Sequence, residues 1–249
     1  MKRLTAVALT LAGAMLAQVA LAAEITVLSG GAVEPGLKAA TTAFEKETGH
    51  TVKITFNTSP QIAKRVTGGD VFDVVIAPPG AIKEFAKAEK VEDGGSNLGR
   101  VGSGVAIRPG APVPDISSAD AIKRVVLEAE SIVFNRASTG IYIENMLKKM
   151  GVYDQIESRT TRYPDAFAVM EHVAKGKGRE VAFGPITEIL LFRDKGVRLV
   201  GPLPAEIQNY TSYIAARMSA GPNKEAADAF VRFLGGPVAK PLFVAAGIE

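Results

Sequence analysis

The fold prediction begins from the sequence VLSGGAVEPGL (Val27–Leu37). An apolar run ends in the small, polar turn Ser29-Gly30-Gly31, and residues 33–44 then carry apolar side chains three and four apart, as one face of a helix requires. A strand that leads through a tight turn into a helix is the repeating unit of an α/β sheet. The turn itself is either a plain connection or a cradle of backbone N–H groups for an anion.

The same unit recurs along the chain. Strands are predicted at 24–29, 51–57, 73–78, 105–108, 131–135 and 180–184, most of them followed by a helix pattern. The Pro-rich residues 109–114 separate two such series and are predicted to be a stiff crossing between two lobes. The predicted fold is therefore α/β with two lobes, 23–104 plus 216–249 and 105–215, each a mainly parallel sheet flanked by helices.

The first residues predict export. Lys2 and Arg3 precede an uncharged apolar run at 4–16, and the small-x-small sequence Ala20-Leu21-Ala22 fits a signal peptidase site, so residues 1–22 are predicted to be a signal peptide. No other uncharged stretch approaches the ~20 residues that a membrane-spanning helix needs. The chain has no cysteine and therefore needs no oxidising compartment for disulfides. Together these features predict a periplasmic protein.

Charge and motifs exclude several function classes. The net charge is +3, two units of which belong to the signal peptide, so no nucleic-acid partner is expected. The only histidines, His50 and His172, are predicted to be solvated surface residues, and no nucleophile–base, Walker or metal-ligand motif is present. Asp70 and Asp73 bracket a strand start and are predicted to be turn and capping residues. We therefore expect no catalytic residue, no metal and no cofactor.

Four strand–turn–helix junctions point to anion binding instead. They lie at 28–36, 56–66, 134–147 and 182–190, two in each half of the chain. A helix N-terminus leaves backbone N–H groups unpaired and carries a partial positive charge, so several of them converging on one cleft bind an anion without Lys or Arg. Hydroxyl donors are added at these turns by Ser29, Thr58, Ser59, Ser138 and Thr139.

These junctions carry a resemblance to a known family. The segment ITVLSGGAVEPGLKAATTAFEKETGHTVKITFNTSPQIAKRV with FDVVIAPP resembles the start of periplasmic molybdate-binding proteins, and GVAIRPGAPVPDISS, TGIYIENMLKKMGVYD and EVAFGPITEI continue the likeness. The resemblance implies the type II periplasmic-binding fold, with two lobes joined by a hinge. It also implies a monomeric receptor of an ABC importer that closes on a small oxyanion and is recognised by an inner-membrane permease.

The resemblance also implies which residues contact the ligand. Side-chain hydroxyls map to Ser29 and to Thr58 or Ser59, beside the turn glycines Gly30 and Gly31. Backbone N–H groups map to Ala137, Ser138 and Thr139 and to the turn Pro185–Ile186. A hydroxyl at the return crossing maps to Tyr210 or, with a shifted alignment, to Thr211 or Tyr213.

The departures from the family pattern leave the ligand open. Gly30 and Gly31 replace residues with side chains, which is expected to enlarge the pocket, and Arg136 could pair with a carboxylate. The alternative ligand to molybdate or tungstate is therefore a small organic carboxylate. An exported hydrolase is disfavoured by the missing motifs. A regulator's effector domain is disfavoured by the signal peptide and by the lack of a helix-turn-helix segment.

Overall fold

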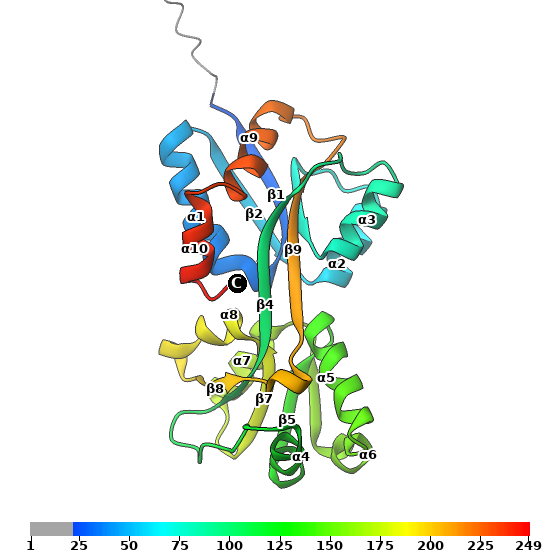
Figure 1. Cartoon of the computed structure of the whole chain (residues 1–249), viewed down its shortest axis with the longest axis vertical. Coiled ribbons are helices and arrows are strands. Elements are labelled where there is room, and N and C mark those ends of the chain that lie inside the picture. Colours follow the sequence, from blue (N-terminus) through cyan, green and yellow to red (C-terminus); the bar gives the residue numbers. More distant parts are fainter. Residues whose placement is uncertain (1–21) are drawn as a thin grey trace, which may run out of the picture.

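A computed structural model describes residues 22–249 (Figure 1), so the predicted signal peptide, apart from its last residue, lies outside the described residues. The strands are β1 (Glu24–Gly30), β2 (Thr51–Asn57), β3 (Val74–Ala77), β4 (Ser96–Ile107), β5 (Ser131–Asn135), β6 (Thr160–Tyr163), β7 (Glu180–Pro185), β8 (Arg198–Pro202) and β9 (Tyr210–Arg217). The helices are α1 (Glu34–Thr48), α2 (Ser59–Thr67), α3 (Pro79–Lys87), α4 (Ala119–Glu128), α5 (Ser138–Lys149), α6 (Tyr153–Ile156), α7 (Ala166–Lys175), α8 (Ile186–Leu190), α9 (Lys224–Leu234) and α10 (Ala239–Ala245). A 3-10 turn, η1 (Gly31–Val33), links β1 to α1.

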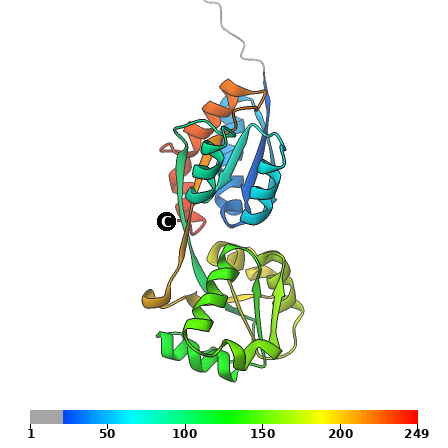
Figure 2. The same ribbon diagram turned by 90° about the vertical axis from the view of Figure 1, so that its right-hand side faces the viewer.

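Two lobes stand one above the other (Figure 1). The upper lobe is built on β1, β2 and β3, and the lower lobe on β5, β6 and β7. Two long strands, β4 and β9, run between them and lie toward one side of the molecule (Figure 2). The predicted lobe boundaries after residues 104 and 215 fall within these two crossing strands.

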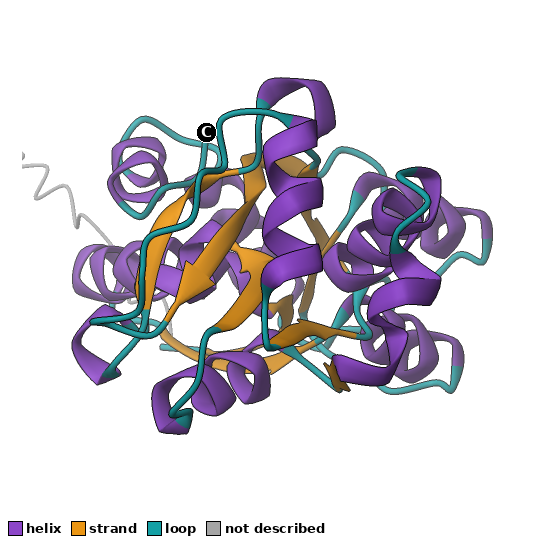
Figure 3. Cartoon of the chain, turned by 90° about the horizontal axis from the view of Figure 1, so that it is seen from below, coloured by secondary structure: helices purple, strands orange, loops and turns teal. Residues whose placement is uncertain are grey.

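Each lobe has a sheet with helices on both faces (Figure 3), and a hydrophobic core lies between the sheet and the helices on each face. In the upper lobe α1, α9 and α10 cover one face, and α2 and α3 cover the other. In the lower lobe α4, α5 and α6 cover one face, and α7 and α8 the other. The apolar positions predicted to point inward do so: Ile62 and Val66 of α2, and Ile143 and Leu147 of α5, are fully buried.

The α/β fold with helix-flanked sheets is confirmed, but its sheets are mixed. Strands β2, β1 and β3 are parallel, as are β6, β5 and β7, whereas β9 runs antiparallel to β3 and β4 runs antiparallel to both β9 and β7. The strand–helix alternation identifies only the strands that helices connect in series. The antiparallel strands arise because the chain must cross to the lower lobe and return.

The crossing itself differs from the prediction. The strand expected at 105–108 is the end of the twelve-residue β4, whose residues 96–102 pair with β9 and whose residues 103–107 pair with β7 and β8. Residues 109–114 come after the crossing and lie against α4 in the lower lobe. Glycines at 99, 102 and 104 make β4 hard to recognise in the sequence, because its stability comes from pairing on both edges rather than from strand propensity.

One helix start and two short elements differ from the prediction. The helix predicted from Pro164 begins at Ala166, because the Asp165 side chain caps it by accepting a hydrogen bond from the Ala168 N–H. The short elements α6 and β6 were not predicted. Gly49, predicted to end α1, does so with a φ of +74°.

Candidate ligand-binding site

A cavity of about 230 Å³ lies between the lobes, at the carboxyl ends of the parallel strands. Ligands of α/β proteins bind at this end, because the turns that follow the strands meet there. The structure brings both halves of the predicted site together in its walls. The predicted residues that line it are Gly30, Gly31, Thr58, Ser59, Ala137, Ser138, Thr139 and Pro185.

The N-terminus of α5 presents unpaired backbone donors to the cavity. The Asn135 Oδ1 accepts hydrogen bonds from the N–H groups of Ala137 at 2.9 Å and Gly140 at 3.0 Å, which fixes the turn before the helix. No described hydrogen bond uses the N–H groups of Ser138 or Thr139. Gly140 is required here, because a Cβ would lie 1.8 Å from the Asn135 carbonyl oxygen. The turn therefore holds its free donors in a fixed direction.

Two further helices begin at the cavity. At α2 the Thr58 N–H and hydroxyl both donate to the Gln61 Oε1, at 2.9 and 3.0 Å, so that Thr58 serves as the helix cap. At α7 the cap is Asp165. These helices have nine and ten residues, and α5 has twelve. All three begin at the cavity, so the positive ends of their dipoles point toward one space.

Gly30 and Gly31 do not enlarge the cavity, contrary to the prediction. A Cβ on Gly30 would lie 2.7 Å from Cε1 of Tyr213, and a Cβ on Gly31 would lie 2.8 Å from Oε1 of Glu188. The space that the missing side chains leave is therefore occupied by an aromatic ring from β9 and a carboxyl group from α8. The glycines let these two groups approach the backbone of the first turn.

Glu188 is the unusual group of the cavity. Its side chain is buried, and burial, followed by the negative charges of Asp165 and Glu34, raises the pKa of Glu188 to about 8. No lysine, arginine or histidine is among the cavity's described lining residues. Burial and the neighbouring Glu188 also raise the pKa of Tyr213, so its hydroxyl stays protonated. The helix N-termini thus supply the positive potential, while Glu188 and Asp165 supply carboxyl groups.

The lobes touch beside this cavity. The hydroxyl of Thr187 on α8 donates a hydrogen bond to the carbonyl oxygen of Ala32 in η1, over 2.6 Å. The Thr187 side chain is fully buried, so this contact excludes water between the lower and upper lobes. The contact holds Glu188, the next residue of α8, against the turn of the upper lobe.

Several predicted site residues lie outside the cavity walls. The Ser29 side chain is fully buried and its hydroxyl donates to the Gly30 carbonyl oxygen at 3.1 Å. Ile186 packs on Gly102 and Gly104 of β4. Tyr210 and Thr211 line a separate, shallower cavity, where the Arg100 guanidinium lies 4.0 Å from the centre of the Tyr210 ring.

Arg136, proposed to pair with a ligand carboxylate, is exposed and is not among the lining residues. The histidines also lie elsewhere and, contrary to the prediction, are half-buried. His50 Nδ1 accepts from the Ala23 N–H, and His172 Nδ1 is hydrogen-bonded to the Tyr163 hydroxyl at 2.9 Å. Residues 22–249 contain no group of three or more acidic or histidine side chains placed to hold a metal ion. They also contain no helix with the length and apolar character to span a membrane.

Four further lining residues are not predicted as site residues from the sequence: Phe56, Asp165, Phe167 and Glu188. Glu188 lies two residues after Ile186 in the apolar run ITEILLF, where a single acid normally marks the solvent face of a helix. Tyr213 also lines the cavity, and it is one of the three positions to which the resemblance maps a ligand-binding hydroxyl at the return crossing.

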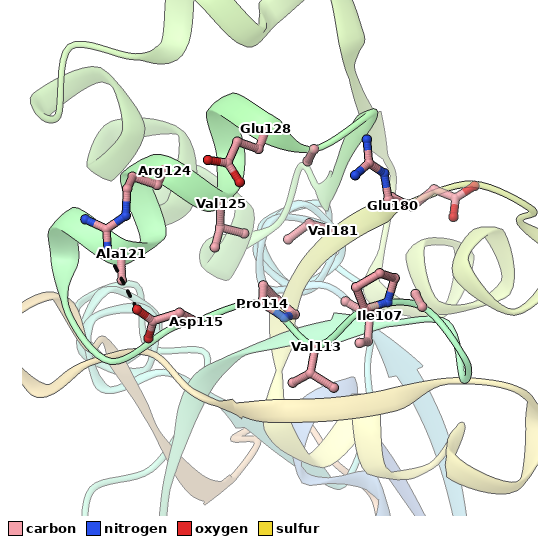
Figure 4. A pocket seen from close by; sticks show the side chains of 14 residues that line it. Ile107, Val113, Pro114, Asp115, Ala121, Arg124, Val125, Glu128, Glu180 and Val181 are labelled. Atoms are coloured by element: carbon pink, nitrogen blue, oxygen red, sulfur yellow. Dashed lines mark ion pairs between the residues drawn. The ribbon is translucent and has the colours of Figure 1, made fainter.

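A third cavity, of about 330 Å³, lies at the opposite end of the lower lobe (Figure 4). It is bounded by residues 111–115, by α4 and by Glu180 and Val181 at the amino end of β7. Its rim carries an ion pair between Arg124 and Asp115 at 3.5 Å, and its floor is formed by apolar side chains such as Val125. None of the four predicted junctions reaches it.

Comparisons with known proteins agree with this architecture. The aconitate isomerase of Pseudomonas sp. is 30% identical over 84% of this chain and 81% of its own length. The molybdate-binding protein ModA of Escherichia coli (strain K12) is 23% identical over 88% of this chain and 86% of its own length. The solved periplasmic molybdate-binding protein of Azotobacter vinelandii superposes with a TM-score of 0.72 at 16% identity, covering 90% of this chain and 98% of that one.

The resemblance to periplasmic molybdate-binding proteins is thereby confirmed. The solved Azotobacter vinelandii relative is a binding protein, whereas the Pseudomonas sp. relative, which has the higher sequence identity, is named as an enzyme. The family model described as bacterial extracellular solute-binding protein matches residues 25–249. The two lobes, the crossing strands and the cavity at the strand ends all lie within that match. The chain therefore belongs to the bacterial extracellular solute-binding protein family.

Proposed function

We propose that the protein is the periplasmic receptor of an ABC importer and that it closes on a small organic carboxylate. Family membership supports the receptor role, and the signal-peptide pattern at 1–22 supports the periplasm. The closed form would be recognised by an inner-membrane permease, and the receptor would act as a monomer. The single observation that supports an organic carboxylate over an oxyanion is the Glu188 carboxyl group in the cavity wall.

A carboxyl group at this place disfavours a bare tetrahedral oxyanion. Such an ion would contact every wall of a closed cleft, and Glu188 would repel it once ionised above its pKa of about 8. An organic acid can place its charged and uncharged parts against different walls. Its carboxylate accepts from the N–H groups at the start of α5, while its carbon skeleton faces Glu188 and the rings of Phe56 and Phe167. The cavity volume of about 230 Å³ leaves room for such a skeleton.

Closure follows from the ligand's contacts with both lobes. Donors at α2 belong to the upper lobe, and donors at α5 and α7 belong to the lower lobe. Only a closed arrangement satisfies a ligand from both sides, and a ligand shifts the equilibrium by its preference for that state. The crossing strands β4 and β9 are the hinge in this proposal.

A panel of anions tests the ligand class. The purified chain is expected to be stabilised by aconitate more than by molybdate, tungstate or sulfate. At a ligand concentration of 100 times the Kd, the gain is about 2.7 kcal/mol, or roughly 5–10 °C in Tm for a chain of this size. Thermal unfolding at fixed ionic strength measures it. A larger Tm shift with molybdate would support an oxyanion ligand instead. No Tm shift with any anion would contradict the proposal that this cavity binds an anion.

Gly31→Ala is expected to weaken ligand binding by about 5- to 150-fold. The new Cβ would lie 2.8 Å from Glu188 Oε1 and would push that carboxyl group out of its position, and overpacking of this kind costs roughly 1–3 kcal/mol. Calorimetric titration measures the affinity. Gly80→Ala is the matched control, since a Cβ there meets nothing within 4 Å. Equal affinities for the two variants would show that the first turn does not shape the site.

A second candidate function is catalysis in the same cleft. It is favoured by the relative named aconitate isomerase, which is 30% identical over most of the chain. Aconitate is an unsaturated tricarboxylate, so an isomerase of this kind moves a double bond in a carboxylate ligand. The receptor and the isomerase would share one ligand class and differ in whether the cleft changes it.

A further inference from the structure

The burial of the Glu188 carboxyl group destabilises the folded protein, and no structural role explains it. The side chain is 7% exposed, and no hydrogen bond lowers the pKa of its carboxyl group, whose neighbours Asp165 and Glu34 are also acidic. A buried carboxyl group without partners is expensive, so one that serves stability is normally paired or hydrogen-bonded.

The other acids near the site show the contrast. Asp165 accepts from the Ala168 N–H at 2.9 Å and thereby caps α7, and the buried Glu34 pairs with Lys38 at 2.5 Å within α1. Each has a structural role that its contacts explain. Glu188 has none, and its oxygen instead faces the cavity above Gly31.

We infer that Glu188 is a catalytic base that moves a proton between two carbons of an unsaturated carboxylate held in the cleft. This inference rests on the proposed binding of an organic carboxylate there. The substrate class is a carboxylate with a methylene group next to a carbon–carbon double bond, as in aconitate. The cavity wall holds two carboxyl groups, and Glu188 is the one for which no hydrogen bond to either oxygen is described, whereas Asp165 caps α7 through its Oδ1.

The step balances without a co-reactant. A Glu188 oxygen takes a proton from the methylene carbon, and the electron pair of the broken C–H bond moves into the allylic system. The same proton is then delivered from Glu188 to the carbon at the far end, where a new C–H bond forms. The double bond has moved by one position, and the Glu188 carboxylate is regenerated. In aconitate this shift exchanges the cis and trans forms.

The cavity provides what the intermediate needs. Negative charge spreads onto the substrate carboxylate, which the free N–H groups of Ser138 and Thr139 and the positive end of α5 stabilise. The Tyr213 hydroxyl, kept protonated in the same wall, is a further donor. The buried Thr187–Ala32 contact beside Glu188 keeps water from the base.

The protonation state of Glu188 suits the task. Burial, Asp165 and Glu34 raise its pKa to about 8, and a base is most effective when its pKa lies near the working pH. The titratable groups that face it are Asp165 from α7, Glu34 from α1 and Tyr213 from β9. The rate is therefore expected to rise with pH and to level off above about pH 8.

The test follows cis-aconitate by proton NMR in D₂O with the full mature chain. Wild type is expected to convert it to the trans form, with deuterium entering the methylene position when the proton on Glu188 exchanges. Glu188→Gln is expected to lose at least about 100-fold of that rate, while calorimetric titration still shows aconitate binding. Glu171→Gln, in an exposed pair with Lys175, is the control and should keep the wild-type rate.

The outcomes separate this inference from the receptor proposal. Binding of aconitate without conversion or deuterium uptake by wild type would overturn the base and leave the receptor standing. Equal conversion rates in wild type and Glu188→Gln would mean that a group other than Glu188 catalyses the conversion. If aconitate does not bind, the inference fails, and the anion panel decides whether the receptor proposal fails with it.

Discussion

Glu188→Gln is expected to make the protein more stable than wild type at alkaline pH and to flatten its pH profile. The folded state raises the pKa of Glu188 from an ordinary value near 4.5 to about 8, so the folded protein holds a proton that the unfolded chain releases. Wild-type stability is therefore lost as the pH rises from about 4.5 to about 8. At about 1.36 kcal/mol for each tenfold difference in proton affinity, the loss is bounded by about 5 kcal/mol.

Chemical denaturation of both proteins at pH 5 and pH 9 measures this effect. At pH 5 the two should be nearly equal, because the wild-type carboxyl group is neutral in the folded state. At pH 9 the glutamine variant should be the more stable, and Glu171→Gln should follow wild type at both values. Parallel profiles for wild type and Glu188→Gln would mean that Glu188 is ionised and well solvated in the folded protein.

Asp73→Ala is expected to destabilise the upper lobe by about 2–5 kcal/mol. The Asp73 side chain is 1% exposed, and its carboxylate accepts from the Thr26 N–H at 2.8 Å, the Thr26 hydroxyl at 2.9 Å and the Asn223 N–H at 2.8 Å. It thereby ties β1 to the start of β3 and to the segment before α9. Alanine would leave these donors without a partner.

Urea denaturation near pH 7 measures the loss, and Asp70→Ala is the matched control. Asp70 forms an exposed pair with Arg65 at 2.7 Å, and such pairs contribute at most about 1 kcal/mol. Burial alone would raise the pKa of Asp73, but the hydrogen bonds from Thr26 and Asn223 outweigh it and lower the pKa. The contribution of Asp73 should therefore shrink as the pH falls. Similar losses for the two variants would contradict this role.

Most of the helices and the parallel strands could be predicted from the sequence, because their signals are local. Apolar side chains three and four apart mark the buried faces of α2 and α5, and Gly49 marks the end of α1. Asp73 is predicted to be a turn or capping residue, but its bonds to the N–H groups of Thr26 and Asn223 join distant segments instead of capping a helix. The crossing strand β4 escaped prediction, because pairing partners far away in the sequence stabilise its glycine-rich residues.

Strand–turn–helix junctions can be recognised in the sequence, and because the first turn of a helix leaves N–H groups unpaired, they predict backbone donors at the ends of several strands. The junction residues Ser59, Ser138 and Thr139 do line one cavity. The other groups that enter this cavity depend on the tertiary structure. Glu188 and Tyr213 reach Gly31 and Gly30 because α8 of the lower lobe and the crossing strand β9 both pack against the first turn. No local pattern encodes that approach, because it depends on how the two lobes are placed by strands that pair across the whole length of the chain.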